Sequence, residues 1–164
     1  MGIGEENNMY YMILFIYKKC EYYCIWVSKD IDYVLAEDKK IICFSNYGEM
    51  KKYAEFEEII FDSEDITRYN IDDIMCICEL ENFDEQCKKI LDFWNICSDV
   101  ANGCKVNFIG SNRIYDSLYE KVFCGNNILN SSQQKYIPRF SESETKALKF
   151  ILKRGIDIII NALT

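Results

Sequence analysis

Histidine is absent from this chain of 164 residues, and several other patterns on which common enzyme chemistry depends are absent too. Without histidine, the Ser-His and Cys-His pairs of nucleophilic catalysis cannot be built. Neither the phosphate loop G-x-x-x-x-G-K-[ST] nor the dinucleotide fingerprint G-x-G-x-x-G occurs, which disfavours nucleotide hydrolysis. One proline and seven glycines leave little linker material, so we expect residues 1–164 to form a single domain, mainly β over 1–62 and mainly α over 70–164.

Long hydrophobic runs are also missing. No apolar run approaches the roughly 20 residues that span a bilayer, and Met9–Tyr17 is too short. Glu5 and Glu6 before it have the wrong charge for a signal peptide. Glu6 also stands where a myristoylation motif beginning at Gly2 needs serine or threonine. We therefore expect a cytoplasmic protein with no membrane partner.

The nine cysteines follow no familiar metal or disulfide pattern. Their number is odd, so they cannot all pair within the chain, and no C-x-x-C spacing occurs. With no histidine, a zinc site would need cysteines alone or cysteines with carboxylates. Most of the cysteines stand in apolar patterns, as Cys43 does, and free cysteine behaves as a small buried hydrophobe. We expect reduced, buried thiols in a reducing compartment, with neither a metal nor a cofactor.

Acidic residues are concentrated in residues 55–85, which we call the acidic stretch. It contains twelve acids and one base, Arg68, for a net charge of −11 against −8 for the whole chain. Apolar residues such as Ile74 and Phe83 are interspersed, so the stretch should fold with its carboxylates outward. A folded anionic surface attracts cationic partners and speeds association. The simpler interpretation is a solvated surface that confers solubility.

Two other interpretations of these carboxylates are weaker. The segment from Asp62 begins like a calcium-binding EF-hand loop, but Thr67 replaces the glycine at its sixth position and Asp73 the glutamate at its twelfth. Neighbouring acids such as Asp72 and Asp73 are usually solvent-exposed, which makes a catalytic acid/base pair the less favoured hypothesis.

Hydrophobic patterning predicts strands in the first part of the chain. Met9–Tyr17 and Glu21–Ser28 are rich in aromatic and β-branched residues, and a short Lys-Lys-Cys turn separates them, so they predict an antiparallel pair. Further short strands are expected at Asp32–Ala36, Lys40–Phe44 and Ile59–Phe61.

Capping patterns predict helices in the second part, because asparagine or serine followed three residues later by an acid typically begins a helix. The predicted helices run from Asn46 to about Phe56, Asn70 to about Glu79, Asn82 to about Ala101, Ser111 to about Phe123 and Ser141 to about Ala162. Gly103 is expected just after the third helix, and Gly155 should cost the last one ~1 kcal/mol. Strands followed by helices predict an α+β fold, with an N-terminal antiparallel sheet of three to five strands packed against a C-terminal layer of about four helices.

Basic residues are in excess from Lys105 to Arg154, with nine bases and four acids. Lys146, Lys149 and Lys153 share one side of the predicted last helix. The pI of about 4.7 argues against a nucleic acid partner, so we interpret these residues as a solvated helix surface.

The C-terminal half resembles a known family. The segments that carry the resemblance are Phe93–Asp99, Ile114-Tyr115, Lys121–Asn127, Tyr136–Ser141 and the pattern Leu148, Ile151, Leu152, Gly155-Ile156. Together they resemble small immunity proteins encoded beside bacterial polymorphic toxins, of the contact-dependent growth inhibition and Rhs type. The resemblance covers about Phe93–Leu163 and does not include the N-terminal sheet or the acidic stretch.

The resemblance implies a protein that is not an enzyme and that binds a cognate toxin domain in the cytosol, blocking its active site or an exosite. Such toxin domains are often basic nucleases. We therefore hypothesise an immunity protein that neutralises its toxin through an acidic surface, with no catalytic, cofactor-binding or metal-binding residues. The proposed toxin-binding residues are Asp62, Glu64, Asp65, Asp72, Asp73, Glu79 and Glu81.

Two alternatives stay open. A small cytosolic enzyme with carboxylate or cysteine chemistry would have a concave pocket with convergent acids of perturbed pKa. An adaptor would bind its partners by adding a strand to an edge of the N-terminal sheet.

Overall fold

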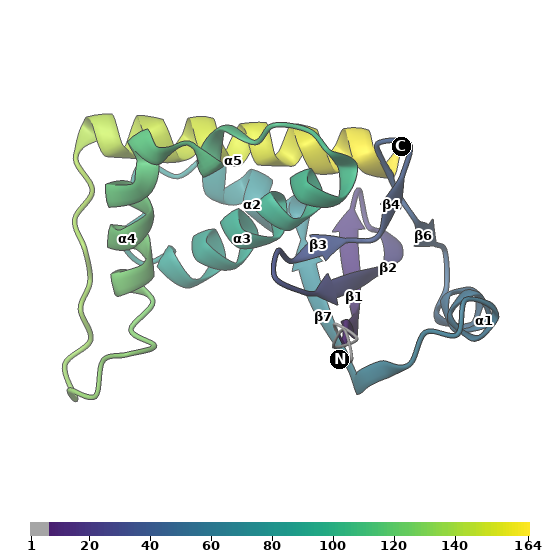
Figure 1. The fold of residues 1–164 in the computed structure, drawn as a ribbon. Helices are drawn as coiled ribbons and strands as arrows, with labels where there is room; N and C mark the ends of the chain where they lie inside the picture. Colours follow the sequence, from purple (N-terminus) through teal and green to yellow (C-terminus); the bar gives the residue numbers. More distant parts are fainter. Residues whose placement is uncertain (1–6) are drawn as a thin grey trace.

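The fold is α+β, as predicted, with the strands in the first 70 residues and most of the helices after them (Figure 1). It is seen in a computed structural model that describes residues 7–164. In chain order the elements are β1 (Met9–Tyr17), β2 (Cys20–Ser28), β3 (Tyr33–Val34), β4 (Ala36–Glu37), β5 (Lys40–Ile41), β6 (Cys43–Phe44), α1 (Tyr47–Phe56), β7 (Phe61–Asn70), α2 (Ile71–Cys78), α3 (Cys87–Cys104), two 3-10 turns at Ile109–Ser111 and Arg113–Tyr115, α4 (Asp116–Gly125) and α5 (Glu142–Leu163).

The main sheet has the strand order β3-β2-β1-β7, and β6 also pairs with β2. The predicted antiparallel pair of β1 and β2 is confirmed, with Met9 opposite Ser28 and Tyr17 opposite Cys20. The tight turn between them has Lys18 and Lys19 in the left-handed region, with φ values of 49° and 61°. β7 runs parallel to β1, so the sheet is mixed and the expected wholly antiparallel pairing is corrected.

Strand β7 is also longer than the predicted strand at Ile59–Phe61, since it continues through the acidic stretch to Asn70. Tyr10 pairs with Phe61, but the next pair is Met12 with Ile66, so residues 62–65 bulge out of the ladder. The Asp62 carboxylate accepts a hydrogen bond of 2.9 Å from the Tyr10 backbone N–H at this bulge. Acids are rare in strands, and for this reason the acidic composition of residues 62–65 did not indicate that β7 is a strand.

The two faces of the sheet are covered by different helices (Figure 1). On one face Met12 and Ile25 pack with Met50 of α1 in a small cluster. On the other face Ile13, Cys24 and their neighbours join the main core with α2, α3 and α5. β1 is therefore buried on both sides, and this explains why its sequence is an almost continuous apolar run.

Three of the predicted helix starts are confirmed by their capping bonds. The Asn46 side chain accepts from the Glu49 N–H at 2.9 Å, and Asn70 accepts from Asp73 at 3.1 Å. Ser141 and Glu144 form the reciprocal capping box that begins α5.

The other two predicted helix starts are wrong. α3 begins at Cys87 and not at Asn82, because Phe83 between them is fully buried and holds the segment in turns before the helix. Ser111 ends a 3-10 turn, and α4 begins only at Asp116.

Glycines mark two places where backbones approach closely. Gly103 lies inside α3, not beyond its end, and a Cβ there would lie 1.9 Å from the Val34 carbonyl oxygen of β3. α3 instead ends at Cys104, with Lys105 in the left-handed conformation, φ 56°. A Cβ at Gly155 would lie 2.5 Å from the Cys97 sulfur, so this glycine allows α5 to pack closely against α3.

We predict that Gly103→Ala destabilises the protein by about 2–3 kcal/mol, because the added methyl group clashes with backbone that cannot move aside as a side chain can. The matched control is Gly48→Ala in α1, where the nearest atom is the Asn46 Oδ1 at 3.4 Å. That change should be neutral or stabilising by up to ~1 kcal/mol, since alanine favours helix. Urea denaturation of both variants tests this, and equal stability of the two would contradict the close contact.

Candidate functional site

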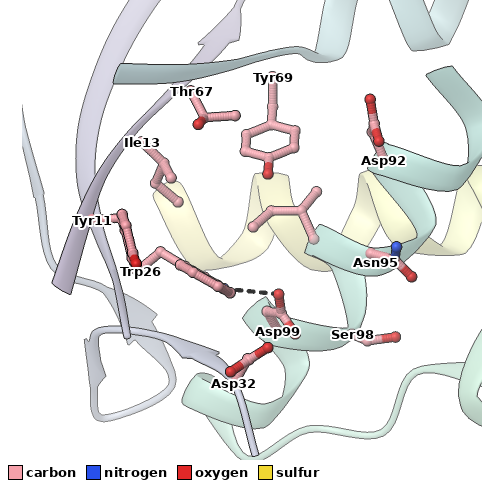
Figure 2. Close-up of a pocket in the computed structure, with 11 residues that line it drawn as sticks. Tyr11, Ile13, Trp26, Asp32, Thr67, Tyr69, Asp92, Asn95, Ser98 and Asp99 are labelled. Atoms are coloured by element: carbon pink, nitrogen blue, oxygen red, sulfur yellow. Dashed lines mark hydrogen bonds between the residues drawn. The ribbon is translucent and has the colours of Figure 1, made fainter. Parts of the chain in front are cut away.

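A pocket of about 430 Å³ lies between the sheet and α3. Figure 2 shows its walls, with the strands on one side and one flank of α3 on the other. The lining residues are Tyr11, Ile13, Trp26, Asp32, Thr67, Tyr69, Asp92, Asn95, Ile96, Ser98 and Asp99. They come from three strands, a loop and a helix, so the pocket exists only in the folded chain.

The sheet supplies an aromatic wall. Side chains alternate across a strand, so the residues of β1 and β2 that point toward α3 form two adjacent rows. Tyr11 and Trp26 lie directly opposite each other in these rows, and their ring centroids are 5.3 Å apart. Tyr69 on β7 adds a third ring, and its hydroxyl group points into the pocket in Figure 2.

Helix α3 supplies a polar wall. Asp92, Asn95 and Asp99 are spaced i, i+3 and i+7, which puts them on one flank of the helix. The Asn95 side-chain oxygen accepts a hydrogen bond of 2.7 Å from the Tyr119 hydroxyl, which holds the amide in place. Asp92, at the exposed end, accepts from Lys88 at 3.3 Å along the helix surface.

Asp99 is the acid most altered by its surroundings. Its carboxylate accepts a hydrogen bond of 2.9 Å from the Trp26 indole N–H, drawn as a dashed line in Figure 2. The pKa of Asp99 is raised to about 6: burial is the main cause, the Trp26 hydrogen bond lowers the pKa in part, and the nearby charge of Asp32 adds a smaller increase. Asp32 itself accepts from the Ser28 hydroxyl at 3.2 Å, which anchors it at the edge of the pocket.

Tyr69 remains a proton donor over the physiological range. Burial, together with the charges of Asp92 and Asp99, raises its pKa to about 12. Within residues 7–164, no lysine or arginine lines this pocket. The walls thus present three carboxylates and three aromatic rings, two of them phenols, a combination that suits an organic cation.

A smaller hollow of about 150 Å³ lies next to the pocket and shares Tyr69 and Asp92 with it. Its other lining residues include Arg68, Asp73 and Lys89. The two hollows together follow the helix side of β7, from the pocket to the start of α2. No other described strand pairs with the outer edge of β7, whereas β1 is paired on both sides. At this edge of the sheet, β7 is therefore the strand to which a partner strand could add.

The structure divides the seven proposed toxin-binding residues into two groups, and none of the seven lines the pocket. Asp62, Glu64 and Asp65 lie at the bulge near the start of β7. Asp72, Asp73, Glu79 and Glu81 lie on or just after α2, beyond the other end of the strand. At about 3.3 Å per strand residue, the two groups are roughly 20 Å apart.

Two of these seven acids have partners within the fold. Asp62 bonds to the Tyr10 N–H, as described above. Asp72 accepts from the backbone N–H groups of Lys18 and Lys19 at 2.9 and 3.1 Å, and so holds the β1–β2 turn. The other five acids are exposed.

The pocket residues were not predicted as a site. Asp32, Asp92 and Asp99 lie outside the acidic stretch and far apart in sequence, and Trp26 and Tyr11 look like ordinary strand residues. The available signal was on α3, where Asp92, Asn95 and Asp99 follow helical spacing beside an apolar stripe. That pattern alone is equally typical of a solvated helix flank.

The cysteines are free, as predicted, but not all of them are buried. Cys24, Cys78, Cys87, Cys97 and Cys104 are buried, Cys43 is half-buried, and Cys20, Cys76 and Cys124 are exposed. Across residues 7–164, no three Cys, Asp or Glu side chains come together in a way that could hold a metal ion. The pocket carboxylates are thus spread around its walls instead of converging on one point.

In the described part of the chain, no helix is long and apolar enough to cross a membrane. No family model matches the sequence, and no curated protein matches it. A comparison with solved structures found the C-terminal domain of SatS, in a crystal structure in complex with bromine. The TM-score is 0.49 at 10% identity, covering 94% of this chain and 92% of that chain.

We predict that Asp99→Asn stabilises the protein at neutral pH. The Asp99 carboxyl group has a pKa of about 6 in the folded protein and about 4 in the unfolded one. Its contribution to the free energy of unfolding is therefore fully present below pH 4 and is lost as the pH rises from 4 to 6. Asparagine keeps the acceptor for Trp26 and never carries the charge. The variant should therefore be more stable than wild type by about 1 kcal/mol at pH 7.5, after allowing for solvent screening, and the gain should disappear near pH 4.

Urea denaturation of both proteins between pH 4 and 7.5 measures this difference. Asp157→Asn, at an exposed position on α5, controls for removal of one surface charge. A gain that is the same at both ends of the pH range would contradict the burial of the Asp99 charge.

Proposed function

We propose that this protein binds and neutralises a basic partner protein, in the manner of an immunity protein that blocks a toxin domain in the producing cell's cytoplasm. The observation that carries the proposal is the placement of carboxylates: a pocket lined, among the described residues, by three acids and no base lies between two groups of exposed acids along β7 and α2. A cationic protein surface is the partner that this arrangement attracts.

The physical advantage lies in rate and selectivity. Clustered carboxylates steer a basic partner toward the complex and repel nucleic acid, whose phosphates carry the same charge. A basic nuclease that is bound here would have its phosphate-binding surface covered by carboxylates. No catalysis by this protein is required for neutralisation.

The internal hydrogen bonds refine the set of proposed binding residues. Asp62 and Asp72 serve the bulge and the β1–β2 turn, so their replacement would disturb the fold as well as binding. The exposed acids Glu64, Asp65, Asp73, Glu79 and Glu81 remain as candidates for direct contact.

The test is protection from a toxin. The candidate toxin is the C-terminal domain of the protein encoded by the reading frame beside this gene; it is expressed with and without this protein, and growth is scored. We predict that replacing Asp73, Glu79 and Glu81 together by lysine slows association with that domain by about tenfold or more and weakens protection. The association rate of wild type should also fall steeply with added salt.

The control replaces three exposed acids outside the acidic stretch by lysine: Glu37 on β4, Glu120 on α4 and Asp157 on α5. It changes the net charge equally, so it should retain protection if the location of the charge matters. Both triple variants are first compared by thermal unfolding. Full protection by the first variant, or equal loss in both, would contradict binding at α2.

A second candidate function, a small enzyme with carboxylate chemistry, is favoured by one observation. Asp99 has a pKa of about 6 in a concave pocket with two further carboxylates, which is the arrangement expected of a general acid or base. Under this alternative, Asp99→Asn would abolish turnover of a small cationic substrate. Protection from a toxin by a variant that carries Asp99→Asn would separate the two functions.

A further inference from the structure

We infer that the pocket between the sheet and α3 is a binding site for the guanidinium group of an arginine side chain from the partner protein. The inference deepens the proposed function, because it names the residue type that the partner would insert. It rests on the shape and walls of the pocket. None of the acids in the acidic stretch lines this pocket.

The cavity and its aromatic walls favour a flat group. The volume of about 430 Å³ lies within the range of small-molecule pockets, about 300–1,000 Å³. Tyr11 and Trp26 lie next to each other on the sheet wall, with ring centroids 5.3 Å apart and planes inclined by 47°. A planar cation stacks on such rings more favourably than a neutral group, and arginine does so more often than lysine.

The charges favour a cation with several hydrogen-bond donors. Asp32, Asp92 and Asp99 lie around the pocket, and no described lysine or arginine side chain lines it. The acids are not grouped as metal ligands, so one small ion cannot satisfy them together. A guanidinium group presents five N–H donors in a fork, so it can bond at the same time to Asp99 on α3 and to the nearby Asp32 on the loop before β3.

Asp99 is the residue on which binding should depend most. Its carboxylate is half-buried and already accepts from the Trp26 indole N–H at 2.9 Å, which orients it beside the aromatic wall. A neighbouring cation would offset the unfavourable burial of its charge. The same bond makes the Trp26 indole N–H a direct reporter of whatever binds there.

The test follows the two tryptophan indole N–H signals of the full-length ¹⁵N-labelled protein by NMR. The probe is N-acetyl-arginine amide, and its neutral isostere N-acetyl-citrulline amide is the matched control ligand. We expect arginine amide to shift the Trp26 signal saturably, with citrulline amide binding at least about tenfold more weakly. The Trp94 indole, which donates to the Gly110 carbonyl at 3.1 Å in the core, should not move.

N-acetyl-lysine amide is the third ligand. It should bind several-fold more weakly than the arginine probe, because its ammonium group has neither the forked N–H donors nor the planar shape of a guanidinium group. Equal binding of lysine and arginine amides would overturn the assignment to guanidinium. Equal shifts with citrulline amide, or no saturable shift with arginine amide, would overturn the site altogether.

Two variants complete the test. Asp99→Asn should lower the affinity for the arginine probe at least about tenfold, while Asp157→Asn on α5 should leave it unchanged. Unchanged affinity in Asp99→Asn would contradict the inference, and the Trp26 signal itself shows whether that variant is folded.

The same variant distinguishes this inference from the proposed function. If Asp99→Asn protects cells fully while the α2 charge reversal does not, the pocket inference is wrong and the proposed function stands. If Asp99→Asn loses both probe binding and protection, both are supported.

Discussion

The rest of the structure depends on the backbone contact between α3 and β3 at Gly103. There the helix approaches the Val34 carbonyl so closely that a methyl group would not fit, so the C-terminal end of α3 is held against one edge of the sheet. At Gly155 the long helix α5 also packs closely on α3, because a Cβ there would lie 2.5 Å from the Cys97 sulfur. Because these contacts hold α3 in place, its apolar side is buried in the main core. Its flank from Asp92 to Asp99 then faces the aromatic residues of β1 and β2. The pocket is a consequence of this packing.

The pocket combines groups that would not be placed together if stability of the fold were the only requirement. A half-buried carboxylate with a raised pKa opposes stability at neutral pH, and a second acid beside it adds repulsion. Aromatic rings could have been buried against an apolar helix flank at lower cost. Such locally unfavourable arrangements are common at binding sites, where stability is traded for recognition. This contrast, more than the number of acids, separates the pocket from the solvated carboxylates along the acidic stretch.

Local physics accounts for the elements that were predicted well. β1 is an unbroken apolar strand, and the capping asparagines at 46 and 70 and the serine at 141 act within three residues of their partners. The failures share one cause, which is that tertiary contacts outweighed local preference. β7 is a strand through acids because β1 offers it a ladder, and Asn82 does not begin α3 because Phe83 beside it is taken into the core. From the sequence, Gly103 was expected beyond the end of its helix and Gly155 was expected to weaken the last one, whereas in the fold both lie inside helices at points of close packing.

The sequence by itself determined the α+β class, most of the capped helix starts, the absence of histidine-based chemistry and the local excess of acidic residues, because each of these depends on composition or on neighbours along the chain. The location of those acids was decided only by the tertiary structure. The later part of β7, from Ile66 to Asn70, separates the proposed binding acids into two groups, and two of these acids accept hydrogen bonds from backbone N–H groups. The pocket was likewise decided only by folding, since Trp26, Tyr69 and Asp99 meet through strand pairing and the packing of a helix that no short-range pattern encodes.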